Sequence, residues 1–168
     1  MNHLKLFVVS LLISLVISPA VFAATVDINW VEPDKFQDIE SAESRQERFQ
    51  ERVFKSLGNT IETLAARLPD TYHMNISVTD IDLAGDVKFT HTERIRIVDD
   101  LYFPSIKLNY ELLDKEHKSL AASDVRVKDM GFLQGIHHSA RHRDFLHYEG
   151  IMLQDWFKKT FAEYLVQK

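Results

Sequence analysis

The chain has 168 residues, no cysteine and a formal net charge of −5 at pH 7. This acidic balance argues against a nucleic-acid partner, because phosphate binding is driven by clustered Lys and Arg. The lack of cysteine excludes disulfides and the lipid anchor of a bacterial lipoprotein, so burial of apolar side chains must hold the fold together.

The N-terminal segment predicts export. Lys5 precedes an uncharged apolar run over residues 6–17, and residues 21–23 place small side chains at the positions that a signal peptidase reads. The run is shorter than the roughly 20 residues that span a bilayer. We therefore expect a cleaved signal peptide over residues 1–23, a periplasmic protein without stable membrane insertion, and a single domain over residues 24–168.

The first elements after this segment are a strand and a long helix. Residues 25–33 alternate apolar and polar side chains until Pro33, which predicts a strand. In residues 44–70 apolar side chains recur at helical spacing, and Pro69 ends the run. This pattern predicts an amphipathic helix whose apolar face packs in the core.

Further strands and a second helix follow. Alternation predicts strands over residues 72–81 and 94–100, and a hairpin over residues 105–127 with its turn at DKEHK and a bulge near Ala121 and Ala122. Residues 147–167 predict the C-terminal helix. The fold class expected is α+β, in which an antiparallel sheet of about four to five strands carries both helices on one face.

The stretch SVTDIDLAGD, residues 77–86, contains Asp80, Asp82 and Asp86. Continuing the alternation of the preceding strand places Asp80 and Asp82 on its apolar face, where a carboxylate is costly unless it is paired or hydrogen-bonded. Either the strand ends at Val78, or Asp80 accepts backbone amides, or an arginine or a metal ion meets it. Arg94 and Arg96 offer plain ion-pair partners.

Two interpretations of the acidic stretch remain open. A turn at residues 83–85, capped by Asp side chains, requires no ligand. A calcium loop of the EF-hand type fits poorly, because Ala84 and His91 stand where carboxylate oxygens are needed.

Several motifs carry a resemblance to a known family. In order they are VDINWVEP, VTDIDLAGD, YELLD, KDMGF and YEGIMLQDWFKKTF, and they span nearly all of residues 26–161. Together behind a signal peptide they resemble the bacterial domain-of-unknown-function family 3016. The resemblance implies an exported, small, single-domain protein, and it brings no catalytic residues to this chain.

Residues 135–149 contain four histidines and two arginines. If this segment is helical, His138 and His142 stand at i and i+4, a spacing that lets two imidazoles share a zinc or nickel ion. Alternatively, Arg141 and Arg143 join the histidines in a patch that binds phosphate or carboxylate groups. The third interpretation is a solvated basic loop.

The function that these features favour is non-catalytic binding of an envelope component or a partner protein, without a cofactor. The chain has no nucleophile elbow and no glycine loop for phosphates. In the KDMGF motif, Met130 and Phe132 either form a contact surface or close the end of the core. Candidate binding residues are Asp80, Asp82, Asp86, Arg94, Arg96, Met130, Phe132, Arg141 and Arg143.

Two other functions stay as alternatives. The first is a metal-binding protein that holds a divalent ion such as zinc through His138 and His142. The second is a hydrolase built on the aspartates of residues 77–86.

Overall fold

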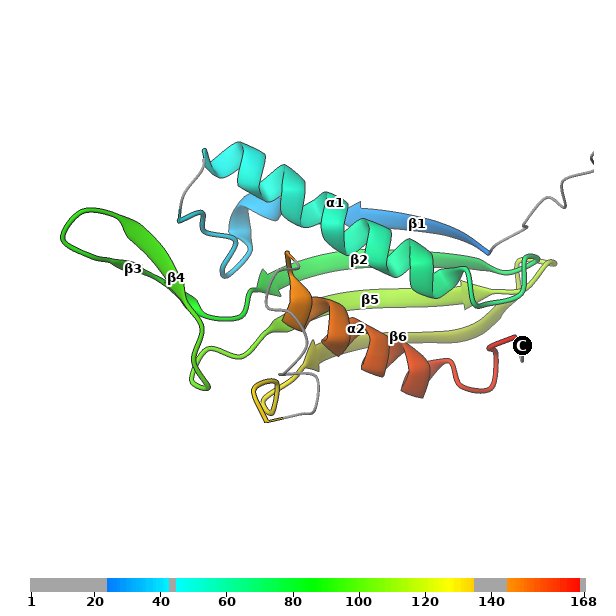
Figure 1. The fold of residues 1–168 in the computed structure, drawn as a ribbon. Helices are drawn as coiled ribbons and strands as arrows, with labels where there is room; N and C mark the ends of the chain where they lie inside the picture. Colours follow the sequence, from blue (N-terminus) through cyan, green and yellow to red (C-terminus); the bar gives the residue numbers. More distant parts are fainter. Residues whose placement is uncertain (1–23, 43–44, 135–144, 167–168) are drawn as a thin grey trace, which may run out of the picture.

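The computed structural model describes residues 24–42, 45–134 and 145–166. Its elements (Figure 1) are β1 (Thr25–Trp30), the short 3-10 helix η1 (Pro33–Lys35), α1 (Gln46–Ala65), β2 (His73–Asp82), β3 (Asp86–Phe89), β4 (Arg94–Ile97), β5 (Ser105–Leu113), β6 (Ser119–Lys128) and α2 (His147–Thr160). The predicted signal peptide lies outside the described residues. Within them, no helix is long and apolar enough to cross a bilayer.

Four strands form one mixed sheet in the order β1-β2-β5-β6. β1 pairs with β2 in parallel, whereas β2–β5 and β5–β6 are antiparallel pairs. α1 connects β1 to β2, and a helical crossover of this kind returns the chain in its original direction. The expectation of an antiparallel sheet is therefore wrong for β1, because alternating side chains report which face a strand buries and not the direction of its neighbour.

Both helices cover the same face of the sheet, as predicted (Figure 1). α1 buries its apolar stripe against the sheet, and α2 buries Met152, Leu153 and Phe157 beside it. Each apolar side chain that is fully buried contributes about 1.5–3 kcal/mol to folding. The other face of the sheet is polar and carries, among others, Asp27, Asn75, Lys107, Asn109 and Asp124.

β2 contains a bulge between Val78 and Asp80. The extra residue, Thr79, reverses the alternation, so that Ile81 is fully buried instead of Asp80. Asp80 and Asp82 therefore point to the polar face of the sheet. The prediction that they share the apolar face is wrong, because it assumed that strict alternation continues past Val78, whereas the bulge interrupts it.

The hairpin formed by β5 and β6 is confirmed. The carboxylate of Asp114 accepts the N–H groups of Glu116 and Lys118, at 2.9 and 3.0 Å, and so closes the predicted turn. The register of the two strands shifts at Leu120, next to Ala121, where a bulge was expected. Local turn chemistry and strand alternation agree here, which explains why the sequence predicts this part well.

β3 and β4 form a separate two-stranded hairpin, which we call the arm. The arm projects from the end of β2, away from the helices and the four-stranded sheet (Figure 1). The strand expected over residues 94–100 is thus present over residues 94–97, but outside the main sheet. An isolated two-stranded hairpin is marginally stable in water, so the position of the arm depends on the contacts at its root.

Candidate functional site

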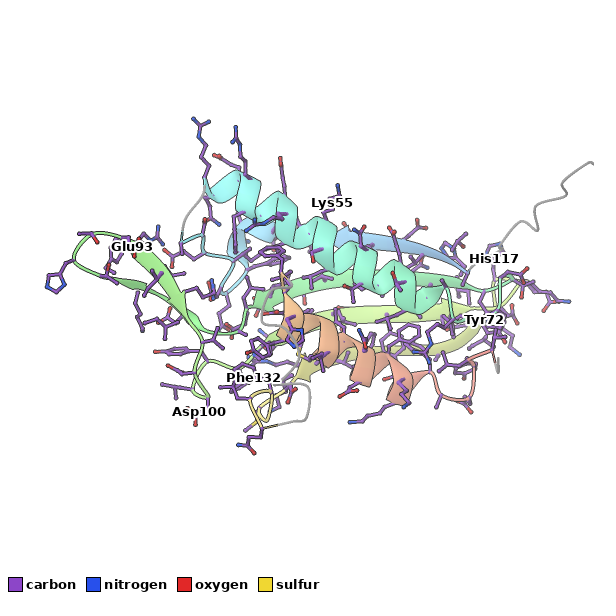
Figure 2. All side chains as sticks on the ribbon, viewed as in Figure 1. Lys55, Tyr72, Glu93, Asp100, His117 and Phe132 are labelled. Carbon is purple, nitrogen blue, oxygen red and sulfur yellow. The ribbon has the colours of Figure 1, made fainter. Side chains whose placement is uncertain are left out.

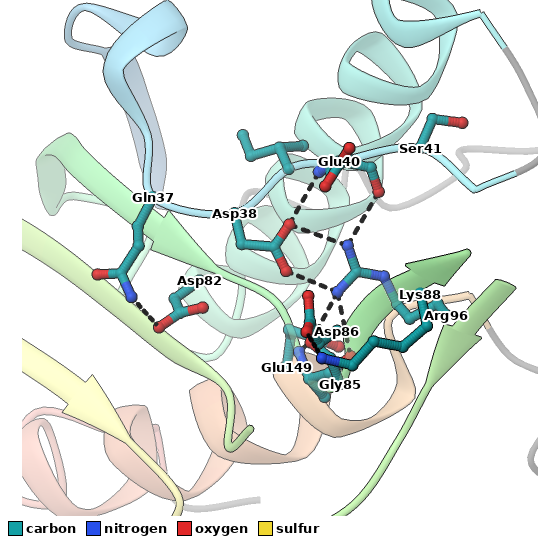
Figure 3. Close-up of polar contacts among 12 residues, drawn as sticks. Gln37, Asp38, Glu40, Ser41, Asp82, Gly85, Asp86, Lys88, Arg96 and Glu149 are labelled. Atoms are coloured by element: carbon teal, nitrogen blue, oxygen red, sulfur yellow. Dashed lines mark hydrogen bonds and ion pairs between the residues drawn. The ribbon is translucent and has the colours of Figure 1, made fainter. Parts of the chain in front are cut away.

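Arg96 of β4 ties the arm to the body of the protein (Figure 3). Its guanidinium group makes a bidentate ion pair with Asp38, at 2.7 and 3.0 Å, and donates to the carbonyl oxygens of Gly85 and Glu40, each at 2.9 Å. The side chains of Arg96 and Asp38 are only 18% and 19% exposed. Charge-assisted bonds in this fork geometry are strong and directional, so they fix the direction of the arm.

The arm leaves β2 through a turn that requires glycine. Gly85 has a φ of 81°, a left-handed conformation that residues with a Cβ rarely adopt. A Cβ at this position would also collide with the carbonyl group of Ile97. The N–H of Gly85 donates to the carbonyl oxygen of Tyr102 at 2.9 Å. The missing side chain therefore lets the chain segments at the root of the arm approach closely.

Glu149 is a buried acid beside the same turn (Figure 3). It lies in the first turn of α2, is 3% exposed, and accepts the N–H of Ala84 at 2.8 Å. Burial raises the pKa of Glu149, while the hydrogen bond from Ala84 and the charge of Arg96 act in the opposite sense. This carboxyl group connects the start of α2 to the turn from which the arm emerges.

Asp80 and Asp82 hold the segment before α1 against β2. Asp80 accepts the backbone N–H of Gln37 and the ammonium group of Lys107, both at 2.8 Å. Asp82 accepts the side-chain amide of Gln37 at 2.9 Å. Burial raises the pKa of Asp82. Of the arrangements expected for Asp80, acceptance of a backbone amide is the one that occurs.

The arginines of β4 do not pair with these aspartates. Arg94 pairs with Glu40, and Arg96 pairs with Asp38, so both bind the segment between η1 and α1. The alternative in which Arg94 or Arg96 forms an ion pair with the acidic stretch therefore does not occur. The cause is the projection of the arm, which carries β4 out of the main sheet.

Asp86 is separate from the other two aspartates. It begins β3 and pairs with Lys88, and the hydrogen bond from Lys88 lowers the pKa of Asp86. Among the described residues it shares no hydrogen-bonding partner with Asp80 or Asp82. The acidic stretch thus serves two different parts of the fold.

An open pocket borders the root of the arm, formed by residues 33–34 and 36–40 together with Gln46 and Gln50. The amide of Gln46 accepts the N–H of Ser41 at 3.0 Å and donates to the carbonyl oxygen of Ile39. The amide of Gln50 donates to the carbonyl oxygen of Pro33 at 3.3 Å. Both amides are therefore used to hold the surrounding chain.

Exposed apolar side chains lie at the end of the sheet from which the arm projects (Figure 1). We call this region the arm end and define it as the arm with residues 98–104 and 129–134; Asp100 and Phe132 mark its lower part in Figure 2. Within the described residues, one other large apolar side chain, Val166 near the C-terminus, is similarly exposed. The exposed apolar residues of the arm end are Phe89 (80%), Leu101 (71%), Met130 (61%), Ile97 (42%) and Val98 (40%).

The two apolar residues of the KDMGF motif have different surroundings. Met130 is exposed, in agreement with a contact surface. Phe132 is 7% exposed and packs edge-to-face on Tyr148, with ring centroids 4.9 Å apart. Phe132 is thus buried against Tyr148 and not free to make an outside contact, whereas a contact role for Met130 stays a prediction.

The histidine-rich candidate lies outside the described residues. This holds for His138, His142, Arg141 and Arg143, so the structure leaves their arrangement untested. In the part of the chain that is described, no three His, Asp or Glu side chains are placed to hold a metal ion.

Sequence reasoning missed Asp38 and Glu149. Glu149 precedes Met152 and Leu153 by three and four residues, so helical spacing would have placed it on the buried face of α2. No comparable signal marks Asp38, which lies in a loop and meets Arg96 only through the tertiary fold.

A comparison with curated proteins gave no match, and neither did a comparison with solved structures. The model of the family described as "Protein of unknown function (DUF3016)" matches residues 24–159. This match covers well over half of the chain and includes every element described above except the last residue of α2. The chain therefore belongs to the DUF3016 family.

Proposed function

We propose that this chain is an exported, periplasmic protein that acts without catalysis, by binding an envelope component or a partner protein through the arm end. The observation that carries the proposal is the exposure of Phe89, Leu101 and Met130 in segments that lie at the same end of the sheet. Apolar groups exposed together on a folded protein are typical of contact surfaces.

The composition of the arm end supports this role. The guanidinium carbon of Arg94 lies 5.2 Å from the ring centre of Phe89, and the ammonium group of Lys88 lies 4.9 Å from that of Tyr102. Aromatic, Met and Arg side chains are enriched in protein interfaces. Because cation–ring contacts already order these side chains, less conformational entropy is lost when a partner binds.

The root of the arm supports it further. Arg96, Asp38 and Glu149 fasten the arm at its base without using its apolar residues. A hairpin that is held at one end and carries an exposed Phe89 next to its turn presents that side chain in a defined direction. Such preorganisation favours binding.

Export is supported by the N-terminal sequence. The family match begins at residue 24, the first residue after the proposed cleavage point. The test is the intact mass of the protein recovered from a periplasmic extract. A mass that still contains residues 1–23, or recovery only from the cytoplasm, would contradict this part of the proposal.

Binding is tested with immobilised protein and a detergent extract of the cell envelope. We expect a component that the unchanged protein retains and that Phe89→Ser or Leu101→Ser loses. Val166→Ser is the matched control, because it removes an exposed apolar side chain at the opposite end of the sheet. Repeating the capture with a chelator separates this function from metal-dependent binding through His138 and His142. Equal capture by all variants would refute the assignment to the arm end.

A further inference from the structure

β1 is an edge strand whose outer side is unpaired among the described residues. The N–H groups of Thr25 and Val31 donate to carbonyl oxygens on the β2 side, at 3.2 and 2.8 Å. Ladder bonds alternate along a strand, so the backbone groups of Val26, Ile28 and Trp30 point away from β2. These three residues form a row of free donors and acceptors.

The two edges of the sheet differ in their protection. β6 carries three charged side chains, and the hydroxyl group of Tyr164 donates to the carbonyl oxygen of Leu120 at 3.3 Å. β1 has no Lys, Pro, Gly or bulge, and its one charge, Asp27, lies on the polar face 3.1 Å from His73. Proteins normally protect a free edge strand with charged side chains, proline or a bulge. Because β1 lacks this protection on its outer side, its edge can accept another strand.

An apolar groove runs along this edge. Val26, Ile28 and Trp30 form one wall, and α1 forms the other with Phe54, Gly58 and Asn59. The ring of Trp30 stacks on that of Phe54, with centroids 4.6 Å apart. A strand added beside β1 would therefore bury apolar side chains on the helix-covered face while it completes the backbone ladder.

We propose that a second copy of this chain covers the edge, with the two β1 strands antiparallel across a two-fold axis. The register that fits places Ile28 opposite Ile28 of the second copy and Val26 opposite Trp30. All the outward-pointing residues of both strands then exchange N–H···O bonds, and the apolar side chains stay on one face. The sheet continues from one copy into the other, as a self-complementary interface requires.

The charges of α1 favour a second copy over an unrelated strand. A Cβ at Gly58 would lie 3.9 Å from Cδ1 of Ile28, so an axis at Ile28 passes close to Gly58 and Asn59. The two α1 helices then run antiparallel across the axis, so residues at equal distances on either side of Gly58 and Asn59 face each other. Lys55 of each copy therefore lies opposite Glu62 of the other copy, which gives two such pairs. Both side chains line the groove and are exposed, and neither has an ion-pair partner among the described residues; Figure 2 shows Lys55 on the outer side of α1.

The test is sedimentation equilibrium of the purified protein in the form that the cell produces. We expect a dimer, and we expect Lys55→Glu and Glu62→Lys each to raise its dissociation constant by about tenfold, because each replaces two attractive contacts by two repulsive ones. The double variant should restore association. Lys118→Glu, in the exposed turn between β5 and β6, is the control for Lys55→Glu, because it changes the net charge by the same amount.

Val26→Pro tests the backbone ladder. It removes an N–H that the single copy does not use, so it should abolish the dimer while circular dichroism stays unchanged. A protein that remains monomeric up to about 100 μM would overturn the proposal. So would a dimer that ignores both charge reversals, or one that the double variant fails to restore. None of these results bears on the arm end, which this interface does not use.

Discussion

The ion pair of Arg96 can be tested by replacing Arg96 with Met. Methionine keeps most of the apolar stem but removes the guanidinium group, and with it two bonds to Asp38 and the bonds to the carbonyl oxygens of Gly85 and Glu40. Asp38, whose side chain is 19% exposed, is then left without a counter-charge. The substitution should loosen the root of the arm and lower the free energy of unfolding.

We expect a loss of about 3 kcal/mol for Arg96→Met. Breaking a fully buried ion pair by removing one partner costs about 3–5 kcal/mol, and a hydrogen bond to a charged group contributes about 1.5–3 kcal/mol. Both side chains of this pair keep almost one-fifth of their exposure, so water recovers part of the loss. The expected value therefore lies at the lower end of the range for buried pairs.

Arg94→Met is the matched control on the same strand. Arg94 forms an ion pair with Glu40, and these side chains are 32% and 54% exposed. Exposed ion pairs contribute about 0.2–1 kcal/mol, so this variant should lose less than one-third of the stability that Arg96→Met loses. The two substitutions remove the same charge, which cancels any general effect of net charge.

The assay is urea unfolding followed by the fluorescence of Trp30 and Trp156, which lie in β1 and α2. Amide hydrogen exchange at Gly85 reports the root of the arm directly, because it detects local opening that precedes global unfolding. If both variants lose the same stability, or if Arg96→Met loses less than about 1 kcal/mol, the ion pair does not anchor the arm.

Three more substitutions test other parts of the fold. Gly85→Ala should lower the free energy of unfolding by more than about 1 kcal/mol, since it combines a left-handed φ with a clash against Ile97; a neutral result in urea unfolding would contradict the turn geometry. Gly150→Ala should raise it by up to about 1 kcal/mol, because a Cβ there meets nothing within 4 Å and alanine favours α2; a loss in thermal melts would show a hidden contact. The folded-state pKa of Glu149 is raised above its ordinary value of 4.5, so its stabilising contribution is complete below that pH and is lost as the pH rises through the folded-state pKa. Glu149→Gln should therefore gain stability relative to the unchanged protein as the pH rises, and equal pH profiles would contradict this.

The sequence predicts those parts of the fold in which apolar side chains recur at helical or strand spacing and are also the side chains that the fold buries. α1 and α2 follow a helical stripe, and β5–β6 follows strict alternation with a turn that Asp114 closes. In these segments the local preference and the tertiary packing agree, so a pattern over about ten residues is enough. Their packing on one face follows, because each has a single apolar side to bury.

The remaining features depend on tertiary position, which a local pattern does not contain. The parallel direction of β1 is set by the path of α1, and the bulge at Thr79 shifts the phase of β2 without any glycine or proline to mark it. The same limit applies to the candidate site. Asp38 and Arg96 are 58 positions apart in the chain and meet only because the tertiary fold places the root of the arm beside the loop before α1.

The position of the arm in the sequence indicates that it is an addition to the sheet. Asp82 and Ser105 are register partners in β2 and β5, so a turn of about two to five residues would be enough to join these strands. The chain instead inserts residues 83–104 and fastens them with a buried carboxyl group, an ion pair and a turn that requires glycine. Buried polar groups of this kind contribute less to stability than apolar residues of similar volume would. The sheet does not need the insertion to pair its strands, and the exposed apolar residues Phe89 and Leu101 add nothing to the core. The proposed binding role would give a reason for an arm that is fastened at its root by polar contacts and exposes Phe89 next to its turn, whereas stability alone gives none.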